Sequence, residues 1–264
     1  MSDPFLTWVD AAERRYLADL TRAEVGRALR ALSSCYVERR SRLAAGAPLA
    51  SAGKRAAFAL FYGPLHFLAV RQIIDRLGLA GRQGPAAITD LGCGTGAAGA
   101  AWALASGGRA AVAGFDVNAW AVHEAAWTYR TLGVHGVARR VPLRRVDLSG
   151  RRSAVLAAFV VNELAAEERA ALLPRLLTTS GQGRPVLVVE PIARRLSPWW
   201  AEWVHAFEAA GGRADEWRVP VELPRLLREL DHAAGLDHRE ITARTLLAGA
   251  VAVSGPLPGG PTGG

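Results

Sequence analysis

The spacing of hydrophobic and polar residues changes near residue 85 of the 264-residue chain. Before that position, apolar residues recur every three or four positions, as they do along one face of an amphipathic helix. After it, short apolar runs alternate with helical stretches, a rhythm typical of a mostly parallel sheet with helices on both faces. We therefore expect an α/β fold preceded by a helical appendage.

The segment before residue 85 is predicted to be helical. Asp3-Pro4 begins a first helix, because the aspartate can cap it and proline suits its first turn. Thr21-Arg-Ala-Glu24 is a capping box that begins a second helix. Gly63-Pro64 is expected to break a third helical piece, and Gly78 to end the fourth. These helices make up the appendage, residues 1–84.

The rest of the chain is predicted to form one sheet domain, residues 85–253, and a tail. Strands are expected at residues 86–91, 110–116, 141–146, 154–162, 185–190 and 243–253. Helices are expected at residues 97–106, 119–132, 165–179 and 198–211. The last segment, residues 254–264, contains five glycines and three prolines, so we expect it to be disordered.

A glycine-rich turn follows the first predicted strand. Asp90 ends the strand, Gly92, Gly94 and Gly96 alternate with small residues, and an Ala-rich helix begins directly afterwards. Glycine permits positive φ angles and lets a ligand come close to the backbone. The helix N-terminus adds free N–H groups that suit an anionic or carboxylate-bearing ligand. The turn therefore predicts a ligand site at the end of the first strand.

An acidic residue ends the second predicted strand, where nucleotide-binding folds hold ribose hydroxyls. This residue is Asp116, twenty positions after Gly96. The pair Asp90-Leu-Gly-Cys-Gly-Thr-Gly96 and Gly114-Phe-Asp116 resembles the S-adenosylmethionine (SAM) site of class I methyltransferases. The resemblance implies a Rossmann-like, mostly parallel seven-stranded sheet and SAM as the cofactor. The Gly-x-Gly-x-Gly spacing argues against the alternative of a nicotinamide-dependent oxidoreductase.

Two further residues are candidates for the cofactor site. Val117 follows the ribose-binding aspartate and is expected to face adenine. Asp147 stands where related enzymes place an acceptor for the adenine amino group, but it suits equally well as a cap for the turn at Ser149-Gly150. Asn118 would either reach the edge of the ribose or cap the helix that begins at Ala119, and capping is the expected role.

The candidate catalytic residues are Asn162 and Glu163, which end the most apolar predicted strand. In the related fold this strand end points at the methyl group, so Asn162 is also a candidate cofactor contact. Asn162 would hold an amine or amide through its carbonyl oxygen, and Glu163 would act as a base. The Pro-Pro-aromatic sequence of many amino-methylating enzymes is replaced by Glu163-Leu-Ala165. In the structural alternative, Asn162 satisfies loop backbone and Glu163 caps the next helix.

A second resemblance concerns the molecule that the protein binds or methylates. Residues 158–169 and 186–191 resemble the methyltransferase-like family associated with the mitochondrial small ribosomal subunit and its bacterial relatives. The cysteine-containing segments by which that family would bind an iron–sulfur cluster have no counterpart, since no cysteine follows Cys93. The resemblance implies a ribosome- or RNA-associated role as the alternative to a small-molecule acceptor, which we favour slightly.

Composition narrows the class of protein. The N-terminus has no basic segment leading into an apolar one, and no apolar run approaches the roughly 18 residues of a membrane span, so we expect a cytoplasmic protein without a membrane partner. Cys35 and Cys93 show no metal-ligand spacing, so no metal is expected.

The net charge of +8 is weak evidence for nucleic acid, because Lys54 is the only lysine in an arginine-rich sequence. Arginines nevertheless gather near the third predicted strand, as a phosphate-binding patch or a solvated edge. They are Arg139, Arg140, Arg144, Arg145, Arg151 and Arg152.

Aromatic residues crowd the end of the helical appendage. Tyr62 and His66 would either meet substrate there or pack, together with Phe58, Phe61 and Phe67, in an aromatic part of the core. Packing is the expected role, because most buried aromatic side chains serve it.

Overall fold

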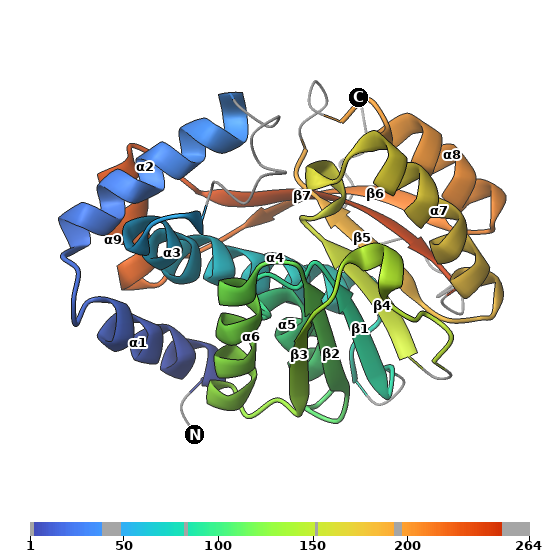
Figure 1. Cartoon of the computed structure of the whole chain (residues 1–264), viewed down its shortest axis with the longest axis horizontal. Coiled ribbons are helices and arrows are strands. Elements are labelled where there is room, and N and C mark those ends of the chain that lie inside the picture. The colour runs from blue at the N-terminus through green and yellow to red at the C-terminus, as the bar shows by residue number, and fades with distance from the viewer. Residues whose placement is uncertain (1–2, 39–48, 82–83, 151–152, 193–196, 250–264) are drawn as a thin grey trace.

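The computed structural model describes residues 3–38, 49–81, 84–150, 153–192 and 197–249. Within these residues a seven-stranded sheet forms the centre of the molecule, with the strand order β3-β2-β1-β4-β5-β7-β6 (Figure 1). Strands β1 to β5 pair in parallel, and β7 runs antiparallel to both β5 and β6. The predicted α/β fold with a mostly parallel sheet of seven strands is confirmed.

The strands divide their side chains between two cores. Ala154 and Leu156 of β4 lie in the core on one face, whereas Val155 and Ala157 lie in the core on the other. This period of two is what a strand covered on both faces requires. The strands are β1 (Ala87–Leu91), β2 (Ala111–Asp116), β3 (Gly136–Arg140), β4 (Ser153–Ala158), β5 (Val186–Glu190), β6 (Arg213–Pro220) and β7 (Glu240–Ala248).

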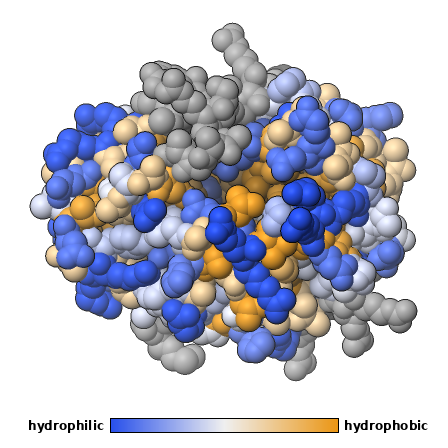
Figure 2. Space-filling view, viewed as in Figure 1, coloured by the Kyte–Doolittle hydropathy of each residue, from blue (hydrophilic) through white to orange (hydrophobic). Residues whose placement is uncertain are grey.

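Helices cover both faces of the sheet. Three of them, α4, α5 and α6, pack on one face, and α7 and α8 pack on the other. The helices are α1 (Pro4–Tyr16), α2 (Arg22–Glu38), α3 (Ala52–Ala57), α4 (Gly63–Arg76), α5 (Ala97–Ala105), α6 (Ala119–Thr131), α7 (Ala166–Gly181), α8 (Trp200–Ala209) and α9 (Arg225–Ala234). Figure 2 shows apolar residues gathered near the middle of one face of the molecule, between flanks that are more hydrophilic.

The predicted helix starts are confirmed. The Asp3 side chain accepts a hydrogen bond from the Phe5 N–H, which caps α1. The capping box of α2 is complete, since Glu24 accepts from the Thr21 N–H and the Thr21 hydroxyl accepts from the Glu24 N–H.

The predicted break at Gly63-Pro64 is wrong. Helices α3 and α4 are joined by a π-helical turn, Phe58–Tyr62, into one continuous helix. The Gly63 N–H donates to the Phe58 carbonyl, five residues back. Pro64 lacks an N–H group and its ring would crowd the carbonyl four residues earlier in an α-helix. The wider π turn removes that conflict, so the chain continues through the proline.

This continuous helix, Ala52–Arg76, is 25 residues long and is apolar enough to cross a membrane by length and composition alone. However, 67% of its most apolar window is buried inside the protein. Core helices of globular domains meet the same two criteria, so the length of the helix reflects its central place in the packing.

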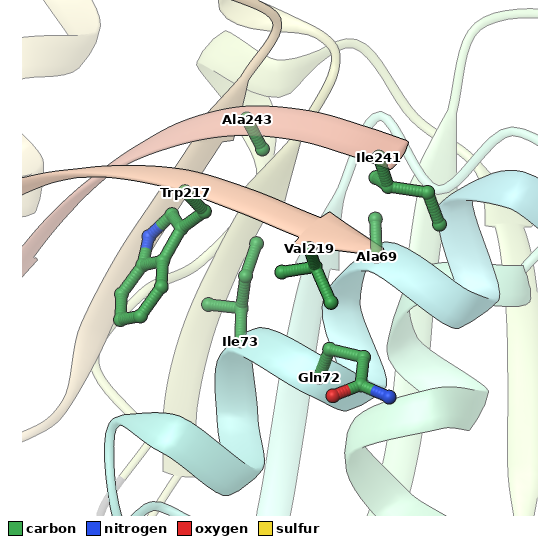
Figure 3. A pocket seen from close by; sticks show the side chains of 7 residues that line it. All are labelled: Ala69, Gln72, Ile73, Trp217, Val219, Ile241 and Ala243. Atoms are coloured by element: carbon green, nitrogen blue, oxygen red, sulfur yellow. The ribbon is translucent and has the colours of Figure 1, made fainter. Parts of the chain in front are cut away.

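Helix α4 also packs against the antiparallel end of the sheet. Figure 3 shows Gln72 and Ile73 of α4 facing Trp217 and Val219 of β6. The gap left between these elements has a volume of about 10 Å³. A space of this size holds about one water molecule at most, so it is a packing gap and not a ligand site.

Three predicted strands have the wrong bounds, and two of them lie in the parallel part of the sheet. The third strand is β3 (Gly136–Arg140), not residues 141–146, where Pro142 precedes a 3-10 turn, Leu143–Arg145. β3 lies at the sheet edge and its residues are exposed or half-buried, so it lacks an apolar run. The fourth strand ends at Ala158 and not at residue 162, because Phe159 adopts a φ of 59° and residues Val161–Glu163 form a 3-10 turn.

The C-terminal part holds two elements that the sequence pattern did not predict, β6 and α9. Only Trp217 and Val219 of β6 are buried, so no apolar run marks the strand in the sequence. Strand β7 begins at Glu240, earlier than predicted, and it ends at Ala248. The predicted disordered tail, residues 254–264, lies outside the described residues.

Helix α2 lies beside α9, although about 200 residues separate them in sequence (Figure 1). A Cβ atom placed on Gly26 would come within 2.9 Å of the Ala233 Cβ, so glycine permits the close approach. The Arg30 guanidinium donates to the Ala233 carbonyl at 2.6 Å. The N-terminal helices therefore pack against an element from the far end of the chain.

Candidate functional site

The glycine-rich turn between β1 and α5 adopts positive φ angles at all three glycines, 66° at Gly92, 52° at Gly94 and 77° at Gly96. A Cβ atom on Gly92 would lie 2.2 Å from the Val160 side chain, and one on Gly96 would lie 2.7 Å from the Tyr129 ring. A Cβ atom on Gly94 would meet nothing closer than 3.8 Å. Two glycines are therefore required by protein packing, whereas Gly94 presents an open face.

Asp90 lies beneath the turn, where it is 1% exposed. One carboxylate oxygen accepts the Gly99 N–H at 3.1 Å, which ties the end of β1 to helix α5. Burial raises the pKa of Asp90 to about 7, and the nearby negative charge of Asp116 acts in the same direction. The structure thus places this predicted cofactor residue where it supports the turn from below.

Asp116 joins the two halves of the candidate site. Its Oδ2 accepts a hydrogen bond from the Gly94 N–H at 3.0 Å, and its Oδ1 accepts from the Asn118 N–H at 2.8 Å. Burial raises the pKa of Asp116, although these two hydrogen bonds oppose the rise. The structure therefore brings the two separate sequence motifs into direct contact.

The residues after β2 lie at an open rim. Val117 is 60% exposed, which is unusual for a large apolar side chain. Asn118 caps α6, as expected, because its side chain accepts the N–H groups of Trp120 and Ala121. Val117 therefore stands next to Asp116 with its side chain free of the core.

Asp147 is exposed, and its carboxylate accepts hydrogen bonds from the backbone N–H and the hydroxyl of Ser149, at 2.8 and 2.9 Å. These bonds hold the pKa of Asp147 below its usual range. These are the contacts that the turn-capping alternative expects. A contact between Asp147 and adenine stays a prediction.

Asn162 is held by a buried network. Glu190 is fully buried, and its carboxylate accepts from the Val161 N–H at 2.7 Å and the Asn162 N–H at 3.2 Å. The Asn162 amide group also donates to Glu190, at 2.5 Å. On its other side, the Asn162 Oδ1 accepts from the Ser197 hydroxyl at 2.6 Å and the Trp199 indole N–H at 3.0 Å.

The network engages the Asn162 amide oxygen, which is the atom that would hold the acceptor in the catalytic hypothesis. An amide oxygen has two lone pairs, and both are engaged when it accepts two hydrogen bonds. The geometry therefore matches the alternative in which Asn162 holds the loop after β4. It does so beside the turn, since Val160 of the same loop packs against Gly92.

Glu163 differs from its neighbour, because it is exposed. The start of α7 is capped by another residue, Glu168, whose carboxylate accepts from the Ala165 N–H at 3.3 Å. A cap from Glu163, the structural alternative for this residue, stays a prediction.

Four of the six arginines near β3 fall on described residues, and all four are exposed: Arg139, Arg140, Arg144 and Arg145. Arg151 and Arg152 lie outside the described residues. Among the residues that the structure describes, no three His, Cys, Asp or Glu side chains come together in a way that could hold a metal ion.

Aromatic side chains near the turn were only partly anticipated from sequence. Phe58 lies next to Gly94, and Phe159 stacks on His66 with ring centroids 3.9 Å apart. Phe58 and His66 were candidates from sequence, because they lie in a segment rich in aromatic residues. Phe159 stood inside an apolar run and gave no signal.

No protein-family model and no curated protein matches the sequence. Solved structures do resemble its fold. The mitomycin 7-O-methyltransferase MmcR aligns with a TM-score of 0.52 and 15% identity, over 94% of this chain and 73% of that chain. The chain has the class I methyltransferase fold.

Two further structures give lower scores. The magnesium protoporphyrin IX methyltransferase ChlM of Synechocystis PCC 6803, with bound S-adenosylhomocysteine (SAH), has a TM-score of 0.48 and 14% identity, over 83% of this chain and 98% of that one. A SAM-dependent methyltransferase from Aquifex aeolicus has a TM-score of 0.48 and 16% identity, over 70% of this chain and 90% of that one. The resemblance to the ribosome-associated family stays a prediction, because no family model matches.

Proposed function

We propose that the protein is a SAM-dependent methyltransferase. The observation that carries the proposal is the link between Gly94 and Asp116, in which the open glycine of the turn and the acid at the end of β2 share a hydrogen bond of 3.0 Å. Ligands of open α/β sheets bind beyond the carboxyl ends of the strands, and this link lies at the ends of β1 and β2.

The residues present fit such a cofactor. A carboxylate has about four positions at which it can accept a hydrogen bond, and each Asp116 oxygen uses one on a backbone N–H. The positions that remain suit the hydroxyl groups of a ribose. Gly94 leaves its side of the turn open for close approach, and the exposed Val117 offers an apolar surface for adenine. When bound, SAM supplies an electrophilic methyl group on a sulfonium.

Asp90 and Asn162, two further predicted site residues, support this site by holding its loops in place. Asp90 fixes the turn to α5, and the Glu190–Asn162 network fixes the loop that packs against Gly92. Methyl transfer depends largely on correct positioning of the two reactants, so rigid support of both loops favours the reaction. Glu163 is exposed at the end of the same loop and is the proposed base.

We favour a small-molecule acceptor. Half-buried aromatic side chains border the turn, and MmcR, which shares the fold, is a methyltransferase whose name states a small molecule, mitomycin. The second candidate is an RNA- or ribosome-associated methyltransferase, which the four exposed arginines near β3 favour.

Calorimetry with SAM, SAH and NAD⁺ tests the proposal directly. Binding of SAM and SAH, but not of NAD⁺, supports a methyltransferase, whereas NAD⁺ binding alone supports the oxidoreductase alternative. A salt titration of RNA binding separates the two methyltransferase candidates. Six phosphate contacts predict a log–log slope of about −4 to −5, while a small-molecule enzyme binds RNA negligibly.

A further inference from the structure

Five half-buried side chains form a continuous row of rings beside the glycine-rich turn. We call this set the aromatic row. It consists of Trp120, Phe58, Tyr62, His66 and Phe159.

Neighbouring members of the aromatic row are in ring contact. The Phe58 ring is 6.4 Å from Trp120 and 6.1 Å from His66, both edge-on, and Tyr62 lies 5.8 Å from Phe58. The His66 and Phe159 rings are nearly parallel, with an interplanar angle of 13°. The row therefore runs without a gap from the start of α6, through the π turn and α4, to the end of β4.

Both parts of the glycine-rich turn border this row. Phe58 is the nearest side chain to the open face of Gly94, since a Cβ atom placed on Gly94 would lie 3.8 Å from the Phe58 ring. Phe159 immediately precedes Val160, which packs against Gly92. A Cβ atom on Gly63, within the same helix as Phe58, would lie 3.0 Å from the hydroxyl of Thr95 in the turn, so this helix sits directly on the turn. The rings therefore border the space beside the turn, where a methyl donor held by the turn would present its methyl group.

Exposure separates the aromatic row from the core. The other aromatic residues of the same helix, Phe61 and Phe67, are fully buried. Phe67 stacks on Phe5 of α1 in the interior, with centroids 4.9 Å apart. The members of the row all keep part of their surface accessible. Tyr62 packs against the core, as expected, and both Tyr62 and His66 also keep part of their surface accessible.

Two local distortions of the backbone lie within the row. In the described part of the chain, Phe159 is the only non-glycine residue with a positive φ. Phe58 and Tyr62 bound the π-helical turn. Both kinds of irregularity occur preferentially at functional sites, because the fold must stabilise them against a regular alternative.

The His66 side chain adds no charge to this surface. Burial lowers the pKa of His66 to about 3, so the imidazole is neutral near pH 7. The Arg55 guanidinium lies at one end of the row, 6.0 Å from the Trp120 ring. Single-stranded nucleic acids bind where stacking rings combine with a basic groove, so the neutral middle of the row favours a small ligand over RNA.

We propose that the aromatic row is the acceptor site, and that the acceptor is a small, flat, uncharged aromatic molecule that stacks against these rings. The inference rests on the proposed methyltransferase function and names its substrate class. Stacked or edge-to-face ring pairs gain energy beyond the area they bury, which gives such a row a preference for aromatic over saturated molecules.

The test compares two probes of similar shape, 2-naphthol and decahydro-2-naphthol, by calorimetry on the full chain saturated with SAH. The row predicts about tenfold tighter binding of 2-naphthol, the equivalent of one or two ring pairs. Phe159→Asn removes the ring but keeps a residue that tolerates positive φ, and it should weaken 2-naphthol binding about fivefold. His66→Leu is the second variant, should Phe159→Asn fail to fold. Phe67→Leu is the matched control in the core, and it should leave 2-naphthol affinity unchanged.

Equal binding of the two probes, or unchanged 2-naphthol affinity in a folded Phe159→Asn or His66→Leu protein, overturns the inference. So does a single-stranded RNA 12-mer whose binding depends on Phe159 while that of 2-naphthol does not. SAH binding is the independent readout. If SAH binds and 2-naphthol does not, the acceptor assignment fails and the proposed function stands. If SAH itself does not bind, the proposed function fails.

Discussion

The Asp116 carboxylate accepts a hydrogen bond from the Gly94 N–H at 3.0 Å, across 22 residues of sequence. The same carboxylate accepts the Asn118 N–H, so the end of β2 fixes both the glycine-rich turn and the start of α6. One side chain thus sets the spacing between the two loops on which the cofactor proposal depends.

We predict that Asp116→Ala weakens SAM binding by about 2–4 kcal/mol, because it removes a charged acceptor from the ribose hydroxyls. Calorimetry measures the change. Asp75→Ala is the matched control, since Asp75 is an exposed aspartate near the end of α4 and is not a candidate for the cofactor site. An Asp116→Ala protein that bound SAM as tightly as the wild type would contradict the ribose assignment.

Gly94→Ala tests the open face of the turn. The substitution places a methyl group at a φ of 52°, which costs about 1–2 kcal/mol of stability for an L-residue. Gly133→Ala is its control, because Gly133 has a φ of 67° and nothing within 4 Å of its Cβ position. Both variants should unfold at lower urea concentrations, but only Gly94→Ala should lose SAM affinity, by about tenfold for a lost close approach to the backbone. Equal SAM affinity in the two variants would show that the cofactor does not approach Gly94.

Asp90 should make stability depend on pH. Its pKa is raised from 3.8 in the unfolded chain to about 7 in the folded protein, so the folded state binds the proton more tightly. The stabilising contribution is therefore complete below about pH 4 and is lost as the pH rises to 7. Asp90→Asn should be more stable than the wild type at pH 8, by on the order of 4 kcal/mol, with the difference shrinking toward pH 4. Urea unfolding of both proteins across this range measures it, and a pH-independent difference would rule the mechanism out.

Asn162→Ala should lower the stability of the protein. The change removes the partner of the Ser197 hydroxyl and of the Trp199 indole N–H, and leaving such groups unpaired costs about 1–3 kcal/mol each when they are buried. Thermal unfolding measures the loss, and SAM affinity of the folded protein should be nearly intact. A stable variant with lost SAM binding would instead place Asn162 among the cofactor contacts.

Glu163→Gln should act on turnover. Because Glu163 is exposed, the melting temperature and SAM affinity should stay at wild-type values, while methyl transfer falls by about 10²–10⁴ for a general base. Transfer of a radiolabelled methyl group to molecules in a cell extract measures it. Glu167→Gln, an exposed glutamate in the first turn of α7, is the control. Wild-type turnover in Glu163→Gln would exclude Glu163 as the base.

The sequence was most informative where a signal is local. Asp90 and Asp116 each end an apolar run, and the glycines between them have few conformational alternatives, so the turn and strands β1 and β2 were predicted at nearly their true bounds. The capping residues Asp3 and Glu24 belong to the same class, because each acts on backbone groups within three residues.

Signals that depend on distant partners were missed. β3 is defined by its pairing with β2 and has an exposed Val137, so no apolar run marks it. Gly63-Pro64 breaks an α-helix by local rules, but a π turn relieves the proline. Asn162 and Glu190 meet because β4 and β5 pair in parallel, which places two strand ends side by side across 28 residues of sequence.

The packing of α2 against α9 constrains the order in which the protein folds during its synthesis. Val25, Leu29 and Leu32 of α2 are fully buried in the finished structure, yet α9 is not complete until residue 234 has been added. Helix α3, which also contacts α2, is synthesised directly after it, but the side of α2 that faces α9 must wait through most of elongation for its partner. Contacts of such long sequence separation form late and slowly. The contact between α2 and α9 is accordingly among the last to form, although α2 is synthesised early.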